Sequence, residues 1–185
     1  MRFDDLFHGT LVRLAAMRPE DREHFARWSN DVEYMRLLDD EPMRPRNPDY
    51  FQLPRVEDEQ NSAFFSIRTI EEDRLIGFCS LFLIEWKNRS CFMGVGIGER
   101  GYWGQGFGSE AVDLLVGYAF RELNLNRVGL YVFDHNVRAR RAYEKVGFTQ
   151  EATLRESAFR DGERYDIHIM GILYREWVTK RRTEG

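Results

Sequence analysis

The stretch GIGERGYWGQGFGSEAV, residues 96–112, decides how the rest of the chain is interpreted, because glycine recurs through it and a helical pattern follows. A glycine inside a regular element costs about 0.5–1 kcal/mol relative to alanine, so this density indicates a backbone that something approaches closely. Glycines ahead of a helix are typical of an anion site, because peptide N–H groups and the positive end of the helix dipole attract negative charge. The stretch therefore predicts a phosphate-binding loop. The glycines stand at positions 96, 98, 101, 104, 106 and 108.

The composition is that of an ordinary globular protein. The chain has 185 residues, of which 43% are hydrophobic and 14% aromatic, and these values predict one domain with a sizeable core. A formal net charge of −4 gives no reason to expect a nucleic-acid partner. Basic residues gather only in the final stretch KRRTEG, which we expect to be a solvated and frayed tail.

Cysteine and histidine usage argues against disulfides and metals. Cys79 and Cys91 both lie in apolar runs, as expected of small buried side chains in a reducing compartment. The sequence has no CxxC pair and no histidine cluster at metal-ligand spacing, so no metal site is expected. The beginning of the chain lacks the apolar core of a signal peptide, and no apolar run has the length of a membrane span. We therefore expect a cytoplasmic protein without membrane contact.

Apolar periodicity predicts a mixed arrangement of strands and helices. Residues 41–49 contain three prolines and predict a loop, running to about residue 60, that is a candidate substrate lid. Tyr50 and Phe51 on this loop are either lid aromatics or core anchors. Asp161 and Gly162 predict a hairpin turn near the end of the chain. The expected elements, in chain order, are strand 10–17, helices 18–30 and 31–40, strands 62–69, 74–86 and 90–98, helix 109–124, strand 127–134, helix 136–148 and a strand hairpin within 156–177.

Three interpretations of the glycine-rich stretch are open, once a Walker loop is excluded because no Lys-Ser or Lys-Thr pair follows at the required spacing. Gly106 to Ala111 satisfies the dinucleotide-binding pattern G-x-G-x-x-A, with Asp134 placed to contact a ribose. Against this, the residues ERGYW separate the glycines from a strand that belongs to an antiparallel meander. A glycine-rich turn without a ligand is the second interpretation, and a resemblance to a known family is the third.

Two motifs resemble those of the GCN5-related N-acetyltransferase (GNAT) superfamily, in its ribosomal-protein and spermidine acetyltransferase branches. YWGQGFGSEAV, residues 102–112, is similar to the family's acyl-CoA pyrophosphate loop, Q/R-x-x-G-x-G/A, with Gly106 and Gly108 at the glycines. Trp103 replaces the usual Gln or Arg, as is familiar in the ribosomal-protein branch. DHNVRARRAYEKVGF, residues 134–148, resembles the family's N-x-x-A/S-x-x-x-Y/L-E-K-x-G-F helix.

The resemblance implies an α/β (α+β) fold, a single GNAT domain whose mixed, mostly antiparallel sheet is splayed around acyl-CoA and flanked by helices. It covers residues 9–178 and leaves 1–8 and 179–185 as terminal tails. The splay would lie between strands 92–98 and 127–133, with acetyl-CoA as co-substrate and no metal. Gly96 and Gly98 could instead permit a β-bulge. The residues implied in coenzyme binding are Val95, Gly96 and Ile97 along the pantetheine arm, Trp103, Gly104, Gln105, Gly106, Phe107, Gly108 and Ser109 around the pyrophosphate, and Asn136 at the start of the next helix.

The implied reaction is direct attack of a neutral amine on the acetyl thioester in a ternary complex, as in an acetyl-CoA-dependent N-acetyltransferase. Tyr143 occupies the family's general-acid position, and a phenol with a pKa near 10 keeps its own proton at rest. The glutamate that relatives often carry on the strand before the loop is absent, since no carboxylate lies between residues 90 and 98. Glu33 is the candidate base, and the alternatives are Glu41, Glu85, His168 or a chain of waters.

The expected acceptor is a primary amine: a protein N-terminal α-amine, a polyamine or another small amine. An acidic stretch would suit a cationic amine, unless it is simply a solvated helix face. Homodimerisation is common in the family, and the C-terminal aromatics could serve it. A second class of function is a non-catalytic acyl-CoA-binding module with a regulatory role. The acidic residues are Asp31, Glu33, Asp39, Asp40 and Glu41.

Overall fold

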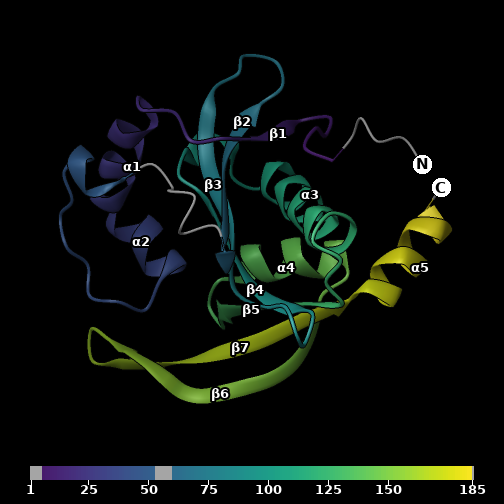
Figure 1. The fold of residues 1–185 in the computed structure, drawn as a ribbon. Coiled ribbons are helices and arrows are strands. Elements are labelled where there is room, and N and C mark those ends of the chain that lie inside the picture. Colours follow the sequence, from purple (N-terminus) through teal and green to yellow (C-terminus); the bar gives the residue numbers. More distant parts are fainter. Residues whose placement is uncertain (1–5, 53–59, 185) are drawn as a thin grey trace.

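A seven-stranded mixed sheet organises the part of the chain that the computed structural model describes, residues 6–52 and 60–184 (Figure 1). The strands are β1 (Val12–Ala15), β2 (Ala63–Thr69), β3 (Leu75–Glu85), β4 (Ser90–Ile97), β5 (Arg127–Phe133), β6 (Thr149–Arg160) and β7 (Glu163–Leu173). They lie in the order β1-β2-β3-β4-β5-β7-β6, and every neighbouring pair is antiparallel except β4 and β5. The predicted meander of three strands, β2 to β4, is confirmed. Part of the expected lid (53–59) and of the expected tails (1–5 and 185) lies outside the described residues.

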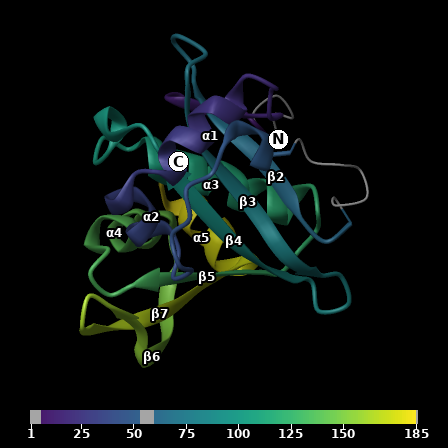
Figure 2. The ribbon, with the colours of Figure 1, turned by 90° about the vertical axis from the view of Figure 1, so that its left-hand side faces the viewer.

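Helices cover both faces of this sheet. The first two lie over one face, where Figure 2 shows them in front of the strands, and the next two pack on the other (Figures 1 and 2). The helices are α1 (Asp21–Ser29), α2 (Val32–Leu38), α3 (Phe107–Arg121), α4 (Val137–Val146) and α5 (Tyr174–Glu184), with 3-10 turns at Pro48–Tyr50 and Arg100–Tyr102. Within the described ranges, no helix is both long and apolar enough to cross a membrane.

The main core lies between the sheet and α3. The helical spacing predicted for this segment is confirmed, because Val112, Leu115, Val116 and Ala119 are all fully buried. Burying a side chain the size of valine or leucine stabilises the fold by about 1.5–3 kcal/mol. These residues pack against strands from both halves of the sheet, so α3 holds the two halves together.

A buried ion pair fixes α1 against the opposite face. Asp21, at the first position of the helix, is 1% exposed and pairs with the guanidinium of Arg68 on β2. The same carboxylate accepts hydrogen bonds from Ser66 Oγ and from the backbone N–H of Arg18, both at 2.9 Å. A buried charge is tolerated when it is paired and hydrogen-bonded in this way. The pair thereby sets the position of α1, and of α2 after it, over the sheet.

The described part of the expected lid is tied to the core at one point. Phe51 packs against Phe25 of α1 with ring centroids 5.8 Å apart, so it is a core anchor. Tyr50 is 55% exposed, and the guanidinium of Arg46 lies over its ring.

The C-terminal segment differs from the prediction. The last strand was expected to continue to residue 177 and residues 179–185 to form a frayed tail, but β7 ends at Leu173 and a helix, α5, follows. The helix is decided by contacts with α3: Trp177 is 5% exposed, packs on Phe120 and donates from its indole N–H to Asp113 Oδ1 at 3.1 Å. These long-range contacts override the strand-like alternation of the local sequence.

The hairpin of β6 and β7 is longer than predicted. Its turn at Asp161 and Gly162 is confirmed, and both residues have positive φ. β6 begins at Thr149 rather than near residue 156, because irregularities at Gln150/Ala152 and Leu154/Ala158 interrupt the alternation that a strand prediction needs. The hairpin extends beneath α2 in Figure 1.

The sheet is splayed between β4 and β5, as expected. The two strands pair only from Ser90 to Phe92 on β4 and from Arg127 to Gly129 on β5. Beyond Phe92, β4 remains paired with β3 on one edge while its edge towards β5 is free. The separation opens the space that holds the candidate site.

Candidate active site

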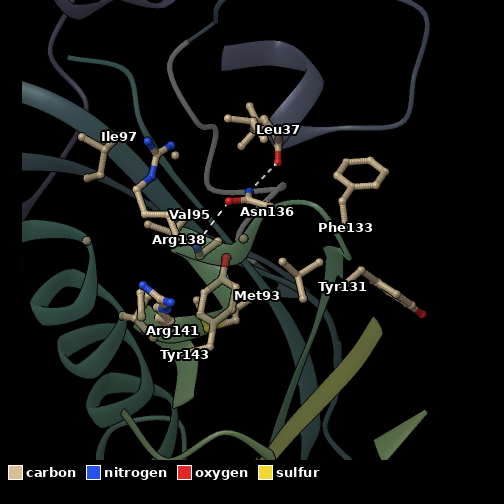
Figure 3. A pocket seen from close by; sticks show the side chains of 18 of the residues that line it. Leu37, Met93, Val95, Ile97, Tyr131, Phe133, Asn136, Arg138, Arg141 and Tyr143 are labelled. Atoms are coloured by element: carbon tan, nitrogen blue, oxygen red, sulfur yellow. Dashed lines mark hydrogen bonds between the residues drawn. The ribbon is translucent and has the colours of Figure 1, made fainter. Parts of the chain in front are cut away.

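A cleft of about 1050 Å³ lies where β4 and β5 separate. Residues 93–97 of β4 form one wall, and the end of α2, the loop before α3, β5 and α4 form the others. Figure 3 shows side chains from four of these elements around the same space. The residues labelled there are Leu37 from α2, Met93, Val95 and Ile97 from β4, Tyr131 and Phe133 from β5, and Asn136, Arg138, Arg141 and Tyr143 at the start of α4 and along it.

The loop before α3, which lines the cleft, has the backbone geometry typical of an anion site. Gly104 and Gly106 have φ of +73° and +96°, a left-handed conformation that favours glycine. An added Cβ at Gly104 would meet nothing within 4 Å, so no protein atom fills the space beside this backbone. Gly106 is the N-cap of α3 and leaves the first turn without a side-chain cap. Uncapped N–H groups and the helix dipole attract an anion here.

Gly96 and Gly98 serve a different purpose. A Cβ at Gly98 would overlap the indole of Trp28, and one at Gly96 would overlap the hydroxyl of Tyr34. The bulge considered for this segment is not found, since the irregularity between β3 and β4 lies between Phe82 and Glu85. These glycines allow side chains of α1 and α2 to approach the strand. Only Gly96 of the pair also lines the cleft.

Trp103 is part of an aromatic and cationic wall. Its indole N–H donates to the carbonyl oxygen of Ile97 at 2.6 Å, which ties the loop to the end of β4. The guanidinium of Arg138 lies 3.7 Å above its ring, a cation–π contact. Partial desolvation beside the Trp103 ring lowers the pKa of Arg138, although the residue stays cationic at neutral pH. Sequence reasoning missed Arg138, but its spacing with Arg141 and Lys145 on one helix face was a signal for a cationic stripe along the cleft.

Not all of the predicted coenzyme residues line the cleft. Gln105 is exposed and its side chain donates to the carbonyl oxygen of Gly101, while Phe107 packs edge-on against Tyr102. Asn136 is 8% exposed and caps α4 by accepting from Ala139 N at 3.2 Å, so the predicted cap is confirmed. The predicted residues that do line the cleft are Val95, Gly96, Ile97, Trp103, Gly104, Gly106, Gly108, Ser109, Asn136 and Tyr143.

Tyr143 lies on the inner face of α4 and is 7% exposed. Figure 3 shows its hydroxyl pointing into the space below Asn136. Burial raises the pKa of this phenol to about 12, so it is neutral throughout the physiological range. A neutral phenol in a cleft wall can donate a hydrogen bond or a proton to a bound group.

The structure does not bring Glu33 to Tyr143. Glu33 pairs with Arg100, whose guanidinium also holds Asp31, and the three lie along a shallow groove outside the cleft. The hydrogen bond from Arg100 lowers the pKa of Asp31. The other candidate bases, Glu41, Glu85 and His168, are also absent from the cleft wall. Asp134, the ribose ligand of the dinucleotide alternative, lies outside the cleft too and bonds to the N–H of His135.

The cleft wall also contains acidic and aromatic side chains. Asp39 and Asp40 are the carboxylates of the cleft wall among the described residues. Arg160, near the tip of the β6–β7 hairpin, donates to the carbonyl oxygens of Arg36 at 2.9 Å and of Asp39, and Arg36 pairs with Asp161. The hairpin therefore fixes the end of α2 that carries the two acids. The aromatic residues of the cleft wall are Tyr34, Phe78, Phe82, Tyr102, Trp103, Tyr131, Phe133 and Tyr143.

Comparison with known proteins places this arrangement in a family. A family model described as an acetyltransferase (GNAT) domain matches residues 12–149. The uncharacterized N-acetyltransferase p20 of Bacillus licheniformis is 29% identical over 170 residues, which cover 90% of this chain and 95% of that protein. The probable N-acetyltransferase YjcK of Bacillus subtilis is 33% identical over 162 residues, which cover 85% of this chain and 84% of that protein.

A solved structure shares the fold. The crystal structure of spermidine N-acetyltransferase from Vibrio cholerae in complex with CoA and spermine matches with a TM-score of 0.79 and 24% sequence identity, covering 92% of this chain and 99% of that one. The fold inferred from the two sequence motifs is therefore confirmed. Together with the splayed sheet and the glycine loop, the family match and the identity to YjcK show that the chain belongs to the GNAT family of acetyltransferases.

Proposed function

We propose that this acetyl-CoA-dependent N-acetyltransferase uses the cleft between β4 and β5 to acetylate the primary amine of a small cationic molecule. The observation that carries the proposal is that one cleft brings together an uncapped helix N-terminus, a strand edge that β5 leaves unpaired and a buried tyrosine. Each of these suits one part of acetyl-CoA: its diphosphate, its pantetheine arm and its departing sulfur.

The coenzyme would lie along the β4 edge of the cleft. The N–H groups of residues 104–109 would bind the diphosphate, with positive charge added by Arg138 and Arg141. The backbone groups of Val95 to Ile97 on the side of β5 would pair with the pantetheine amides as an added strand does, apart from the Ile97 carbonyl oxygen, which already accepts from Trp103. Asn136 would contribute by capping α4 and so orienting that helix.

The reaction would proceed by direct attack on the thioester. The amine nitrogen forms a bond with the carbonyl carbon, the C–S bond breaks, and its electron pair goes to the sulfur. Tyr143 gives its proton to that sulfur, and the proton released by the nitrogen returns through water to the phenolate. Burial raises the pKa of Tyr143 above that of a thiol, so proton transfer from Tyr143 to the sulfur is unfavourable by itself. It becomes favourable when the proton released by the nitrogen neutralises the phenolate. We leave Glu33 out of this scheme because it pairs with Arg100 outside the cleft.

A cationic acceptor is supported by two observations. Asp39 and Asp40 are the carboxylates in the cleft wall among the described residues, at the end that α2 contributes. Among the relatives, spermidine N(1)-acetyltransferase of Vibrio cholerae is 31% identical over 116 residues, 61% of this chain and 66% of that protein. A polyamine or similar small amine therefore fits better than an uncharged acceptor.

Calorimetric titration with acetyl-CoA, followed by thiol release with panels of polyamines, amino acids, aminoglycosides and peptide N-termini, tests the proposal. We expect binding, and thiol release mainly with amines that carry a second positive charge. Release with neutral peptide N-termini alone would contradict the cationic acceptor, and no binding at all would contradict the coenzyme site.

Tyr143→Phe tests the proposed acid. Because phenylalanine fills the same space without the hydroxyl, turnover should fall about 100-fold while the dissociation constant of acetyl-CoA changes less than about threefold. Turnover equal to that of the unsubstituted enzyme would remove Tyr143 as the acid. A regulatory module without catalysis is not favoured. Such a module would bind the coenzyme but show no turnover, with or without the substitution.

We further propose a homodimer formed through the sheet edge. β6 is the terminal strand of the sheet and is largely exposed, with Phe159 64% exposed. An exposed edge strand with an exposed apolar side chain favours pairing with another chain. Light scattering should give twice the mass of one chain, and Phe159→Lys should shift it towards the monomer.

A cytoplasmic location is also part of the proposal. Cys79 and Cys91 are free and buried, and burial raises the pKa of the Cys91 thiol to about 12. Two protonated, unpaired thiols suit a reducing compartment. Cell fractionation of the tagged protein would test this.

A further inference from the structure

Tyr34 carries an unpaired hydroxyl in the wall of the cleft. The residue lies on α2, is 5% exposed, and its hydroxyl is buried without a hydrogen-bond partner among the described residues. The other unpaired buried atoms of this kind there are single Nε atoms of arginines, whose guanidinium groups have further donors. Burial raises the pKa of Tyr34, so the group is a neutral phenol.

An unpaired hydroxyl at this site has an energetic cost. A buried polar group without a partner destabilises the free protein, whereas phenylalanine would fill the same volume without that cost. Tyr34 packs with Trp28 in a second hydrophobic cluster, whose buried members are Phe25, Trp28, Tyr34 and Leu75, so its ring alone is sufficient for packing. The hydroxyl therefore needs a partner that the free protein does not supply.

The position of the hydroxyl points to the ligand as that partner. A Cβ on Gly96 would overlap the hydroxyl, so the oxygen lies directly over β4 at Gly96, within the segment whose edge towards β5 is free. Leu38, which is half-buried at the end of α2, approaches the same point, and its Cδ1 would lie 3.1 Å from that Cβ. Tyr34, Leu38 and Gly96 all line the cleft, so a ligand along β4 is the nearest candidate for that partner.

We propose that Tyr34 is a catalytic residue whose hydroxyl donates a hydrogen bond to the carbonyl oxygen of the acetyl thioester. The inference rests on the proposed function, because it requires acetyl-CoA along β4. When the amine attacks, the C–N bond forms and negative charge gathers on this oxygen until the C–S bond breaks. Tyr34 keeps its proton throughout and stabilises that charge, while Tyr143, from α4, serves the sulfur. A neutral donor is suited to this role because it stays a donor at every working pH.

Tyr34→Phe, titrated with acetyl-CoA and separately with CoA, tests the contact without requiring turnover. The two ligands differ only by the acetyl group. We expect the variant to bind acetyl-CoA about threefold to tenfold more weakly than the unsubstituted protein and CoA within about twofold. Its melting temperature without ligand should be equal or higher. Tyr174→Phe is the matched control, since Tyr174 lies on α5 and is 45% exposed, and it should change neither affinity.

Each outcome has a distinct meaning. Equal weakening of acetyl-CoA and CoA would place the hydroxyl on the pantetheine arm, and unchanged affinity for both would separate it from the ligand; either overturns the inference. A lower melting temperature would show a partner within the free protein and also overturn it. With an amine that the unsubstituted enzyme acetylates, the turnover of Tyr34→Phe should fall about tenfold to 100-fold. If the unsubstituted protein binds neither acetyl-CoA nor CoA, both the proposed coenzyme site and this inference fail. If it binds both ligands but shows no turnover, the comparison of the two affinities still tests the inference.

Discussion

Two pairs of glycines on either side of one turn lack side chains for opposite reasons. At Gly96, on β4, and at Gly98, just after it, the space for a Cβ is filled by Tyr34 and Trp28. At Gly104 and Gly106, in the following loop, the space is nearly empty and the backbone has positive φ. The first pair is required by packing between distant segments, and the second by the local path of the chain and by room for an anion.

The comparison shows that a run of glycines is not one signal. Substitution in the strand pair should lower the free energy of unfolding, because existing side chains would be displaced. Substitution in the loop pair should chiefly weaken coenzyme binding, because the affected space is the one proposed for the diphosphate. Measuring stability and acetyl-CoA affinity on the same variants separates the two cases.

The largest effect is expected for Gly98→Ala. The new Cβ would lie 2.1 Å from Trp28 Cδ2, and the ring is held by a hydrogen bond to Glu99 and by packing on Phe25. Overpacking of this kind costs about 3 kcal/mol of unfolding free energy, measured by urea denaturation. In a Trp28→Leu background the same change should cost much less, because the overlap is gone. A loss below about 0.5 kcal/mol in the original background would contradict the packing explanation.

Gly106→Val should have the second-largest effect, and it should weaken the binding of acetyl-CoA. A β-branched residue at a φ of +96° strains the loop, and its methyl groups would enter the space assigned to the diphosphate. We expect acetyl-CoA affinity to fall about 100-fold, equivalent to about 2.7 kcal/mol, with the circular dichroism spectrum retained. Undiminished affinity in calorimetry would show that the loop does not hold the diphosphate.

Gly108→Ala should raise the stability of the protein slightly, whereas Gly98→Ala should lower it. Gly108 lies in the first turn of α3 without a positive φ, and its added Cβ would lie an ordinary 3.6 Å from Ile97 Cγ1. Alanine raises helix stability by up to about 1 kcal/mol over glycine, so the melting temperature should rise slightly, with coenzyme affinity within about threefold. A tenfold loss of affinity would mean that the ligand also requires glycine at this position.

The smallest effect is expected for Gly101→Ala. This residue is exposed in the 3-10 turn Arg100–Tyr102, and an added Cβ there would meet nothing within 4 Å. Both the free energy of unfolding and the acetyl-CoA affinity should stay within about 0.5 kcal/mol of the original values. A larger change in either would show that the turn itself constrains the site.

The sequence predicted the part of the cleft to which we assign the coenzyme, but not the part to which we assign the acceptor. Gly104, Gly106 and Asn136 act through their own turn or helix start, so a short motif reveals them. In the other part, Asp39 is positioned by Arg160, and the two residues are 121 positions apart in the chain. Glu33 and Asp39 belong to the same acidic stretch of the sequence, and only the fold shows that Glu33 pairs with Arg100 outside the cleft.

The sequence by itself determined the mixed fold, the meander, the glycine loop and the caps of α4, because periodicity, turn residues and capping act over a few neighbouring positions. Only the tertiary structure decided which distant side chains meet: Tyr34 with Gly96, Arg138 with Trp103, and Trp177 with α3, which turned an expected strand end into α5. Such contacts depend on how a whole sheet twists, splays and is covered, and no local pattern encodes them.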